Sequence, residues 1–194
     1  GLRDFAELKE LLLSTDLYFE EQSTLKSPKD RLHDYSKKVK QSIEMVEASI
    51  DMDAIADLCD DIYKYQRVAI FGLLKAGAVS LNLQGDLLML GKQVYTNISY
   101  QQQMEYIMSA NEDDLIIIFS YTGSYFDYQE IRALKNKLKI PKIWFISSEK
   151  SEFPTFLDRI ITFKSLQDQN SHPYQLQFIA SLIAQEYSRK HKFK

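Results

Sequence analysis

The chain has 194 residues and a mass of 22.7 kDa, which suits one domain with at most a small appendage. Its formal net charge of −3 lacks the positive excess of a nucleic-acid-binding domain, and its 45% hydrophobic and 26% charged residues exclude a disordered or collagen-like chain. Glycine is scarce, with six residues where average usage would give about fourteen. A phosphate-binding loop in this chain must therefore rest on very few glycine positions.

The numbers and positions of cysteine and histidine residues limit the disulfides and metal sites that this sequence can form. Cys59 is the only cysteine in the sequence, which excludes an internal disulfide and a cysteine-based zinc site. The three histidines lack the spacing of metal ligands, so we expect neither a metal nor a cofactor. No apolar run approaches the roughly 18 residues of a membrane span, and no signal peptide opens the sequence. We therefore expect a cytoplasmic protein without membrane contact.

The first third of the sequence predicts helices. Asp4 and Glu7 form an Asp-x-x-Glu capping box ahead of an apolar run, and a polar stretch ending at Pro28 predicts a linker. From Lys29 the spacing of apolar residues predicts a long helix, and Asp53 is the expected N-cap of the helix after it. The apolar positions of the long helix are Leu32, Val39, Ile43, Val46 and Ile50.

From residue 67 the pattern changes to short apolar runs rich in β-branched residues, separated by helical stretches. This alternation predicts an α/β fold in which a five-stranded parallel sheet, doubly wound in a flavodoxin-like order, follows the N-terminal helices. The expected strands are 67–71, 93–96, 115–119, 142–146 and 159–163, and the expected helices are 76–90, 100–109, 125–138, 153–157 and 172–190.

Two strand-to-helix turns are candidate ligand sites, because ligands of such sheets bind at the carboxyl ends of the strands. One turn, 71–77, holds Gly72 and Lys75. The other, 120–125, combines hydroxyl groups with one glycine beside a predicted helix N-terminus. Hydroxyls, free main-chain N–H groups and the helix dipole together bind phosphate; the alternative is that these residues only cap the helix. The members of the second turn are Ser120, Tyr121, Thr122, Gly123, Ser124 and Tyr125.

The second turn resembles the Ser-x-Ser-Gly-x-Thr phosphate loop of sugar isomerase (SIS) domains. The stretch 67–163 is similar to the SIS domain of the RpiR family of bacterial sugar-responsive transcription regulators. In that family the first strand leads into Phe-Gly-x-Gly-x-Ser and a helix that ends in Ile-Gly, and here FGLLKA at 71–76 and LG at 90–91 stand at the same spacing. The Asp that opens the family's Asp-x-x-Ile-x-x-Ser strand is matched by Asp114.

The resemblance extends to the N-terminus, where GLRDFAELK at 1–9 is similar to the end of the family's helix-turn-helix domain. It implies that residues 1–28 are the remnant of that domain with a linker, and that residues 29–194 form the SIS effector-binding domain. The implied function is non-enzymatic: a homodimeric regulator domain that senses a phosphorylated sugar or related anion at 120–125. Such a protein reaches DNA only through the missing N-terminal domain.

The resemblance also implies ligand contacts. Ser120 and Gly123 match the phosphate loop, Thr122 keeps the hydroxyl of its second Ser, and Tyr125 replaces its final Thr. His172 lies in a region that is near the ligand pocket in SIS domains. The expected ligand-binding residues are Gly72, Lys75, Ser120, Tyr121, Thr122, Gly123, Ser124, Tyr125 and His172.

Departures from the family pattern keep two alternatives open. In the first turn Leu74 stands at the second Gly of the motif and Ala76 at its Ser, which removes a hydrogen-bond donor. One alternative is a degenerate SIS domain that serves only as a dimerisation scaffold, with Leu74 and Tyr125 filling the pocket. The other is a sugar-phosphate isomerase, which needs an acid–base residue beside the sugar carbonyl. Glu105, Glu130 and His172 are the residues available for that role.

Overall fold

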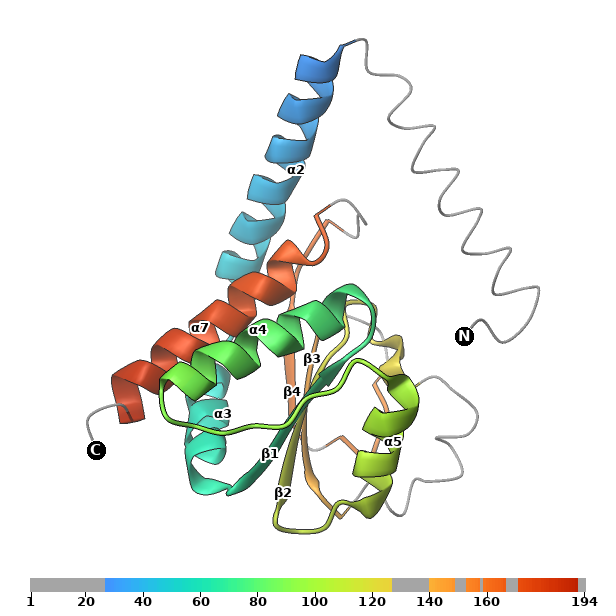
Figure 1. Ribbon diagram of the computed structural model, residues 1–194. Coiled ribbons are helices and arrows are strands. Elements are labelled where there is room, and N and C mark those ends of the chain that lie inside the picture. The colour runs from blue at the N-terminus through green and yellow to red at the C-terminus, as the bar shows by residue number, and fades with distance from the viewer. Residues whose placement is uncertain (1–26, 127–139, 149–152, 158, 167–170, 192–194) are drawn as a thin grey trace, which may run out of the picture.

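The computed structural model describes residues 27–126, 140–148, 153–157, 159–166 and 171–191. Within them a parallel sheet lies between two layers of helices (Figure 1). The strands are β1 (Arg67–Gly72), β2 (Asp114–Phe119), β3 (Lys142–Ser148) and β4 (Arg159–Phe163), and they lie in the order β1-β2-β3-β4. The expected α/β fold with a parallel sheet is confirmed, but the sheet has four strands rather than five.

The segment 93–96, expected as a strand, makes only an isolated parallel bridge between Tyr95 and Ala69 on the outer side of β1. The main chain of Tyr95 accepts from the N–H of Ile70 and donates to the carbonyl of Val68, both at 2.8 Å. The pairing ends there because the hydroxyl of Thr96 donates to the carbonyl of Ile70 at 2.5 Å, where a continuing strand would supply a main-chain N–H. A flavodoxin-like order of five strands is therefore not confirmed.

The helices agree closely with the sequence pattern. They are α2 (Pro28–Ser49), α3 (Met52–Lys64), α4 (Lys75–Met89), α5 (Tyr100–Ser109), α7 (Tyr174–His191) and the short 3₁₀ helix η1 (Ser124–Phe126). The N-cap of α3 is Asp51 rather than Asp53: a carboxylate oxygen of Asp51 accepts from the main-chain N–H groups of Asp53 at 2.9 Å and Ala54 at 3.1 Å.

Other sequence predictions have mixed outcomes. The segment 153–157 is a turn rather than a helix, closed by the N–H of Leu157 donating to the carbonyl of Pro154 at 3.1 Å. The expected capping box of Asp4 and Glu7 and most of the expected helix 125–138 lie outside the described residues. None of the described helices has the length and apolar character needed to cross a membrane.

Both faces of the sheet are buried, which explains the nearly unbroken apolar runs of its strands. Along β1 the side chains of Val68 and Ile70 pack in one cluster with α3, α4 and α7, whereas Ala69 and Phe71 pack in a second cluster with α5 and η1. At the amino end of β2 the fully buried Asp114 pairs with Arg67, with 2.9 Å between its Oδ1 and Nε. Asp114 therefore fastens the first two strands at the sheet edge opposite the candidate turns.

Helix α2 packs on α7 and β4, while its N-terminal end projects beyond the sheet (Figure 1). The apolar stripe expected on α2 is only partly confirmed, since Val46 is fully buried but Leu32 is 66% exposed. Polar side chains at seven-residue intervals hold the helix to the body. Tyr35 donates to the hydroxyl of Tyr174 at 2.9 Å, Ser42 donates to the hydroxyl of Ser171 at 2.9 Å, and Ser49 accepts from the main-chain N–H of Lys164 at 2.8 Å.

Candidate functional site

The turn after β2 begins as an extension of the sheet and then folds back on itself. The N–H of Ser120 donates to the carbonyl of Ile146 at 3.0 Å, which continues the pairing of β2 with β3. The carbonyl of Ser120 then accepts from the N–H of Gly123 at 3.1 Å, and its hydroxyl accepts from the N–H of Tyr125 at 3.3 Å. Gly123 has φ 73°, a left-handed conformation that glycine adopts at little cost. Ser120 and Gly123 thus shape the turn.

Thr122 and Ser124 present their hydroxyls at the exposed surface of this turn. Their Oγ atoms lie 2.6 Å apart, so one hydroxyl donates to the other. Both residues are exposed. Within the described part of the chain, the main-chain N–H of Thr122 has no hydrogen-bond acceptor. Two hydroxyls and an N–H group on a tight turn form a small set of donors suited to anion oxygens.

Tyr121 points the other way, into the body. Its hydroxyl and that of Ser165, which follows β4, are 2.9 Å apart. Its carbonyl accepts from both the N–H of Ser148 at 3.2 Å and the hydroxyl of Ser148 at 2.6 Å. Its ring stacks on His172 with centroids 4.6 Å apart. Tyr121 therefore connects the turn to β3, to the segment after β4 and to the start of α7.

Tyr125 is buried beneath the turn, with 2% of its surface exposed. Its hydroxyl donates to Oε1 of Gln103 at 2.7 Å, and Nε2 of Gln103 donates to the carbonyls of Gly72 at 2.9 Å and Asn97 at 2.6 Å. Burial, and to a lesser degree the neighbouring Tyr100, raises the pKa of Tyr125 well above its usual value. Tyr125 thus stays neutral and links the two candidate turns through Gln103.

The first turn depends on Gly72 for its close packing. A Cβ at this position would lie 2.7 Å from the main-chain carbon and oxygen of Ala76, so α4 can approach β1 only over a glycine. Leu74 has φ 51° and ψ −119° and its side chain is 92% exposed. The alternative in which Leu74 and Tyr125 fill a pocket is not supported, because Leu74 points into solvent and Tyr125 lies in the core.

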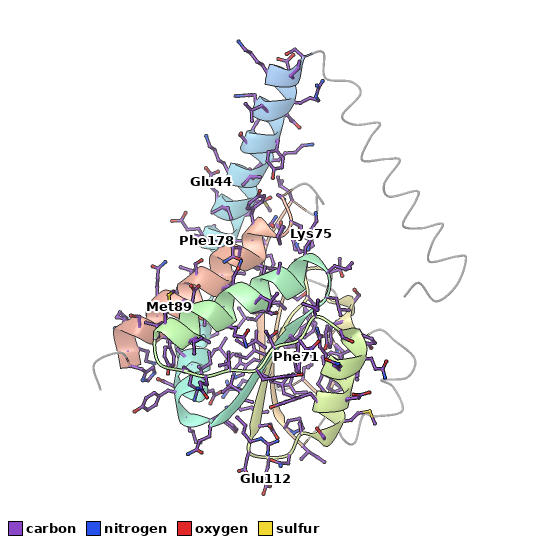
Figure 2. The ribbon with its side chains drawn as sticks, in the orientation of Figure 1. Glu44, Phe71, Lys75, Met89, Glu112 and Phe178 are labelled. Atoms are coloured by element: carbon purple, nitrogen blue, oxygen red, sulfur yellow. The ribbon has the colours of Figure 1, made fainter. Side chains whose placement is uncertain are left out.

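Lys75 and His172 come together at this end of the sheet. The Nζ of Lys75, at the start of α4, donates to the carbonyl of His172 at 3.1 Å, beside the start of α7 (Figure 2). Burial and the charge of Lys75 lower the pKa of His172 to about 4, so its imidazole is neutral at physiological pH. Its Nδ1 is buried and has no hydrogen-bond partner among the described residues.

The structure therefore joins the predicted residues into one connected assembly, in which Lys75 contacts His172, His172 contacts Tyr121, and Tyr125 reaches Gly72 through Gln103. Of the carboxylates considered for proton transfer, Glu105 lies on the exposed face of α5 and accepts from Gln101 at 3.0 Å, and Glu130 lies outside the described residues.

Sequence reasoning missed Gln103, Ser148, Ser165 and Gln175. For Gln103 a signal existed, because it stands four residues before Ile107 on the buried face of an amphipathic helix.

Solved structures share this fold. The Vibrio vulnificus NanR protein complexed with ManNAc-6P matches 82% of this chain with a TM-score of 0.70 and 12% identity, and this chain spans 62% of that protein. The RpiR transcription factor from Sphaerobacter thermophilus (sugar isomerase domain) matches 80% of this chain and 88% of its own, with a TM-score of 0.63 and 15% identity. A phosphoheptose isomerase from Francisella tularensis matches 85% of this chain and 100% of its own, with a TM-score of 0.63 and 13% identity.

No protein-family model and no curated protein matches the sequence. The structural matches nevertheless show that the chain has the fold of a sugar isomerase domain. The expected likeness to the SIS domains of RpiR regulators is confirmed at the level of the fold. The same fold is found in a transcription factor and in an isomerase, so the fold alone does not assign a role.

Proposed function

We propose that this chain is the effector-binding and dimerisation domain of a transcription regulator that responds to a phosphorylated sugar. The observation that carries the proposal is the exposed hydroxyl pair of Thr122 and Ser124 beside the N–H of Thr122, which has no acceptor among the described residues. The likeness to a transcription factor's sugar isomerase domain and to a protein solved with ManNAc-6P supports it.

In this proposal the ligand's phosphate lies against the turn 120–125. The hydroxyls of Thr122 and Ser124 and the N–H of Thr122 donate to phosphate oxygens, while Ser120 and Gly123 keep the turn in shape. Lys75 supplies the positive charge, and its amine lies at this end of the sheet, where it donates to the carbonyl of His172 at 3.1 Å. The sugar then extends toward the turn at Gly72.

The proposed regulator role divides the chain into two parts. Residues 29–194 form the effector domain of a homodimer, and residues 1–28 are the remnant of a helix-turn-helix domain with its linker. The N-terminal end of α2, which follows residues 1–26 in the sequence, projects from the body (Figure 1). DNA is reached through the N-terminal domain, which fits the net charge of −3 on the 194 residues of this chain.

Isothermal titration against a panel of hexose and pentose phosphates tests the ligand. One of them should release or absorb heat, and Thr122→Ala should weaken its binding by about tenfold to hundredfold, because a hydrogen bond to a charged group contributes roughly 1.5–3 kcal/mol. The matched control is Ser109→Ala, whose hydroxyl donates to the carbonyl of Tyr106 on α5 and should leave binding unchanged.

Two outcomes would overturn the proposal. If no sugar phosphate gives a heat of binding while circular dichroism shows that the protein is folded, the proposed binding of a phosphorylated sugar is wrong. Conversion of an aldose phosphate to a ketose phosphate, abolished by His172→Ala but not by His33→Ala, would assign an isomerase instead.

A further inference from the structure

A chain of buried and partly buried polar side chains connects the candidate phosphate turn to helix α2. The hydroxyl of Tyr121 lies 2.9 Å from that of Ser165, and Nε2 of Gln175 donates to Ser165 at 2.9 Å. The same Nε2 donates to the hydroxyl of Ser171 at 2.7 Å, which also accepts from Ser42 of α2 at 2.9 Å. Five side chains from separate segments thus form one hydrogen-bonded network.

The end of the network nearer α2 is enclosed in the protein, where hydrogen bonds are strong and unpaired polar atoms are costly. Ser42, Ser171 and Gln175 are each fully buried. Oε1 of Gln175 is also buried, yet it has no partner among the described residues. The network is therefore incomplete in this arrangement, with one acceptor left over at its centre.

A second arrangement of the same side chains is available. Turning the amide of Gln175 by half a turn places Oε1 opposite Ser165 and Ser171, which then donate to it, and leaves the amide N–H groups as the unpaired group. The bond between Tyr121 and Ser165 can reverse with the amide, since either hydroxyl can be its donor. The first state leaves the acceptor Oε1 unpaired and the second leaves the N–H groups unpaired, so the amide of Gln175 forms a two-state element whose balance depends on the groups around it.

An anion at the turn distinguishes these two states. Negative charge near Tyr121 favours the state whose protons point toward the turn, in which Gln175 donates to Ser165 and Ser165 donates to Tyr121. A mechanical link acts in parallel, because the ring of Tyr121 stacks on His172, which is covalently joined to Ser171. Either route ends at Ser42 of α2, whose hydroxyl donates to Ser171 at 2.9 Å.

We propose that the network of Tyr121, Ser165, Gln175, Ser171 and Ser42 transmits anion binding at the turn 120–125 to the anchoring of helix α2. This inference rests on the proposed binding of an anion at that turn. It assigns a regulatory path to the site, with Gln175 as the residue that joins the two ends. Ser165 and Gln175 are positioning residues here, since neither touches the proposed ligand.

Hydrogen exchange of the whole 194-residue chain, with and without inorganic phosphate as the probe, tests the path. In the natural chain phosphate should slow exchange at 120–126 and change exchange at 38–46 of α2 by at least about threefold. In Ser165→Ala, phosphate should still protect 120–126 while the response of α2 disappears. The matched control is Ser181→Ala, whose hydroxyl donates to the carbonyl of Gln177 on α7 outside the network, and it should behave like the natural chain.

The experiment distinguishes failure of the proposed anion site from failure of the proposed path. If phosphate changes nothing at 120–126, the proposed anion site is wrong. If 120–126 is protected but α2 does not respond, or responds equally in Ser165→Ala, the path is wrong and the site stands. A ligand-free measurement keeps the path testable in either case: Ser42→Ala should accelerate exchange of the amides at 121–125 by at least about threefold, and acceleration no greater than in Ser181→Ala would overturn the path.

Discussion

The hydroxyl of Tyr125 and the amide of Gln103 are joined by a buried hydrogen bond of 2.7 Å, and through it the two turns at the carboxyl end of the sheet share one support. A tyrosine at the last position of a phosphate loop is therefore compatible with a site, because its bulk lies in the core and its hydroxyl serves as a tie. The loop keeps its small hydroxyl residues on the outside.

Removing that hydroxyl should destabilise the fold. Tyr125→Phe leaves Oε1 of Gln103 buried without a donor, so we expect the free energy of unfolding to fall by about 1–3 kcal/mol. Urea unfolding followed by circular dichroism measures the change. Tyr63→Phe is the control, because Tyr63 is 51% exposed and should lose less than about 0.5 kcal/mol. Equal effects of the two substitutions would contradict the role of the Tyr125 bond.

Replacing glycine by alanine should change the stability of the protein in opposite directions at two positions. Gly72→Ala forces a methyl to within 2.7 Å of the main chain of Ala76 and should cost more than about 2 kcal/mol or prevent folding. Gly85→Ala, in the middle of α4 where an added Cβ would meet nothing within 4 Å beyond its own turn of helix, should stabilise the protein by about 0.5–1 kcal/mol. Thermal unfolding of both variants checks the pair, and a stable Gly72→Ala protein would show that α4 can shift away from β1.

The protein should be more stable with glycine than with leucine at position 74. Its φ of 51° with ψ −119° is a conformation that costs a non-glycine residue about 1–3 kcal/mol, and its exposed side chain offers little packing in return. After the extra chain entropy of an unfolded glycine, Leu74→Gly should gain about 1 kcal/mol. Leu74→Ala keeps the strain and should be nearly neutral. The same unfolding curves measure both, and a loss of stability in Leu74→Gly would contradict the strain.

His172 should make stability depend on pH in the mildly acidic range. Its pKa is about 4 when folded and 6.5 when unfolded, so below pH 6.5 the unfolded chain takes up the proton first. The free energy of unfolding should therefore fall as the pH drops from 6.5 toward 4. For a half-buried group the total is about 1–2 kcal/mol.

Urea titrations at several pH values measure this slope. His172→Gln should flatten it, whereas His33→Gln, at an exposed position of α2, should leave it unchanged. A slope that survives in His172→Gln would assign the dependence to another group.

Much of the fold follows from local sequence patterns, whereas much of the site does not. The helix over 100–109 and the buried strands are set by periodicity within a few residues of each position, and so they are predictable. The bond between Ser42 and Ser171 joins residues 129 apart, and no local pattern distinguishes a serine with such a partner from a solvated one. The positive φ of Leu74 was equally hidden, because leucine rarely adopts it.

The bridge at Tyr95 has a consequence for the behaviour of the protein at high concentration. Without the segment around Tyr95, the outer edge of β1 would expose a row of unpaired main-chain donors and acceptors. Such an edge can pair with a strand from another chain. Tyr95 occupies the groups of Val68 and Ile70, and the hydroxyl of Thr96 adds a second bond to Ile70. This short segment therefore occupies main-chain groups in the middle of the β1 edge that a strand from another chain would need for pairing.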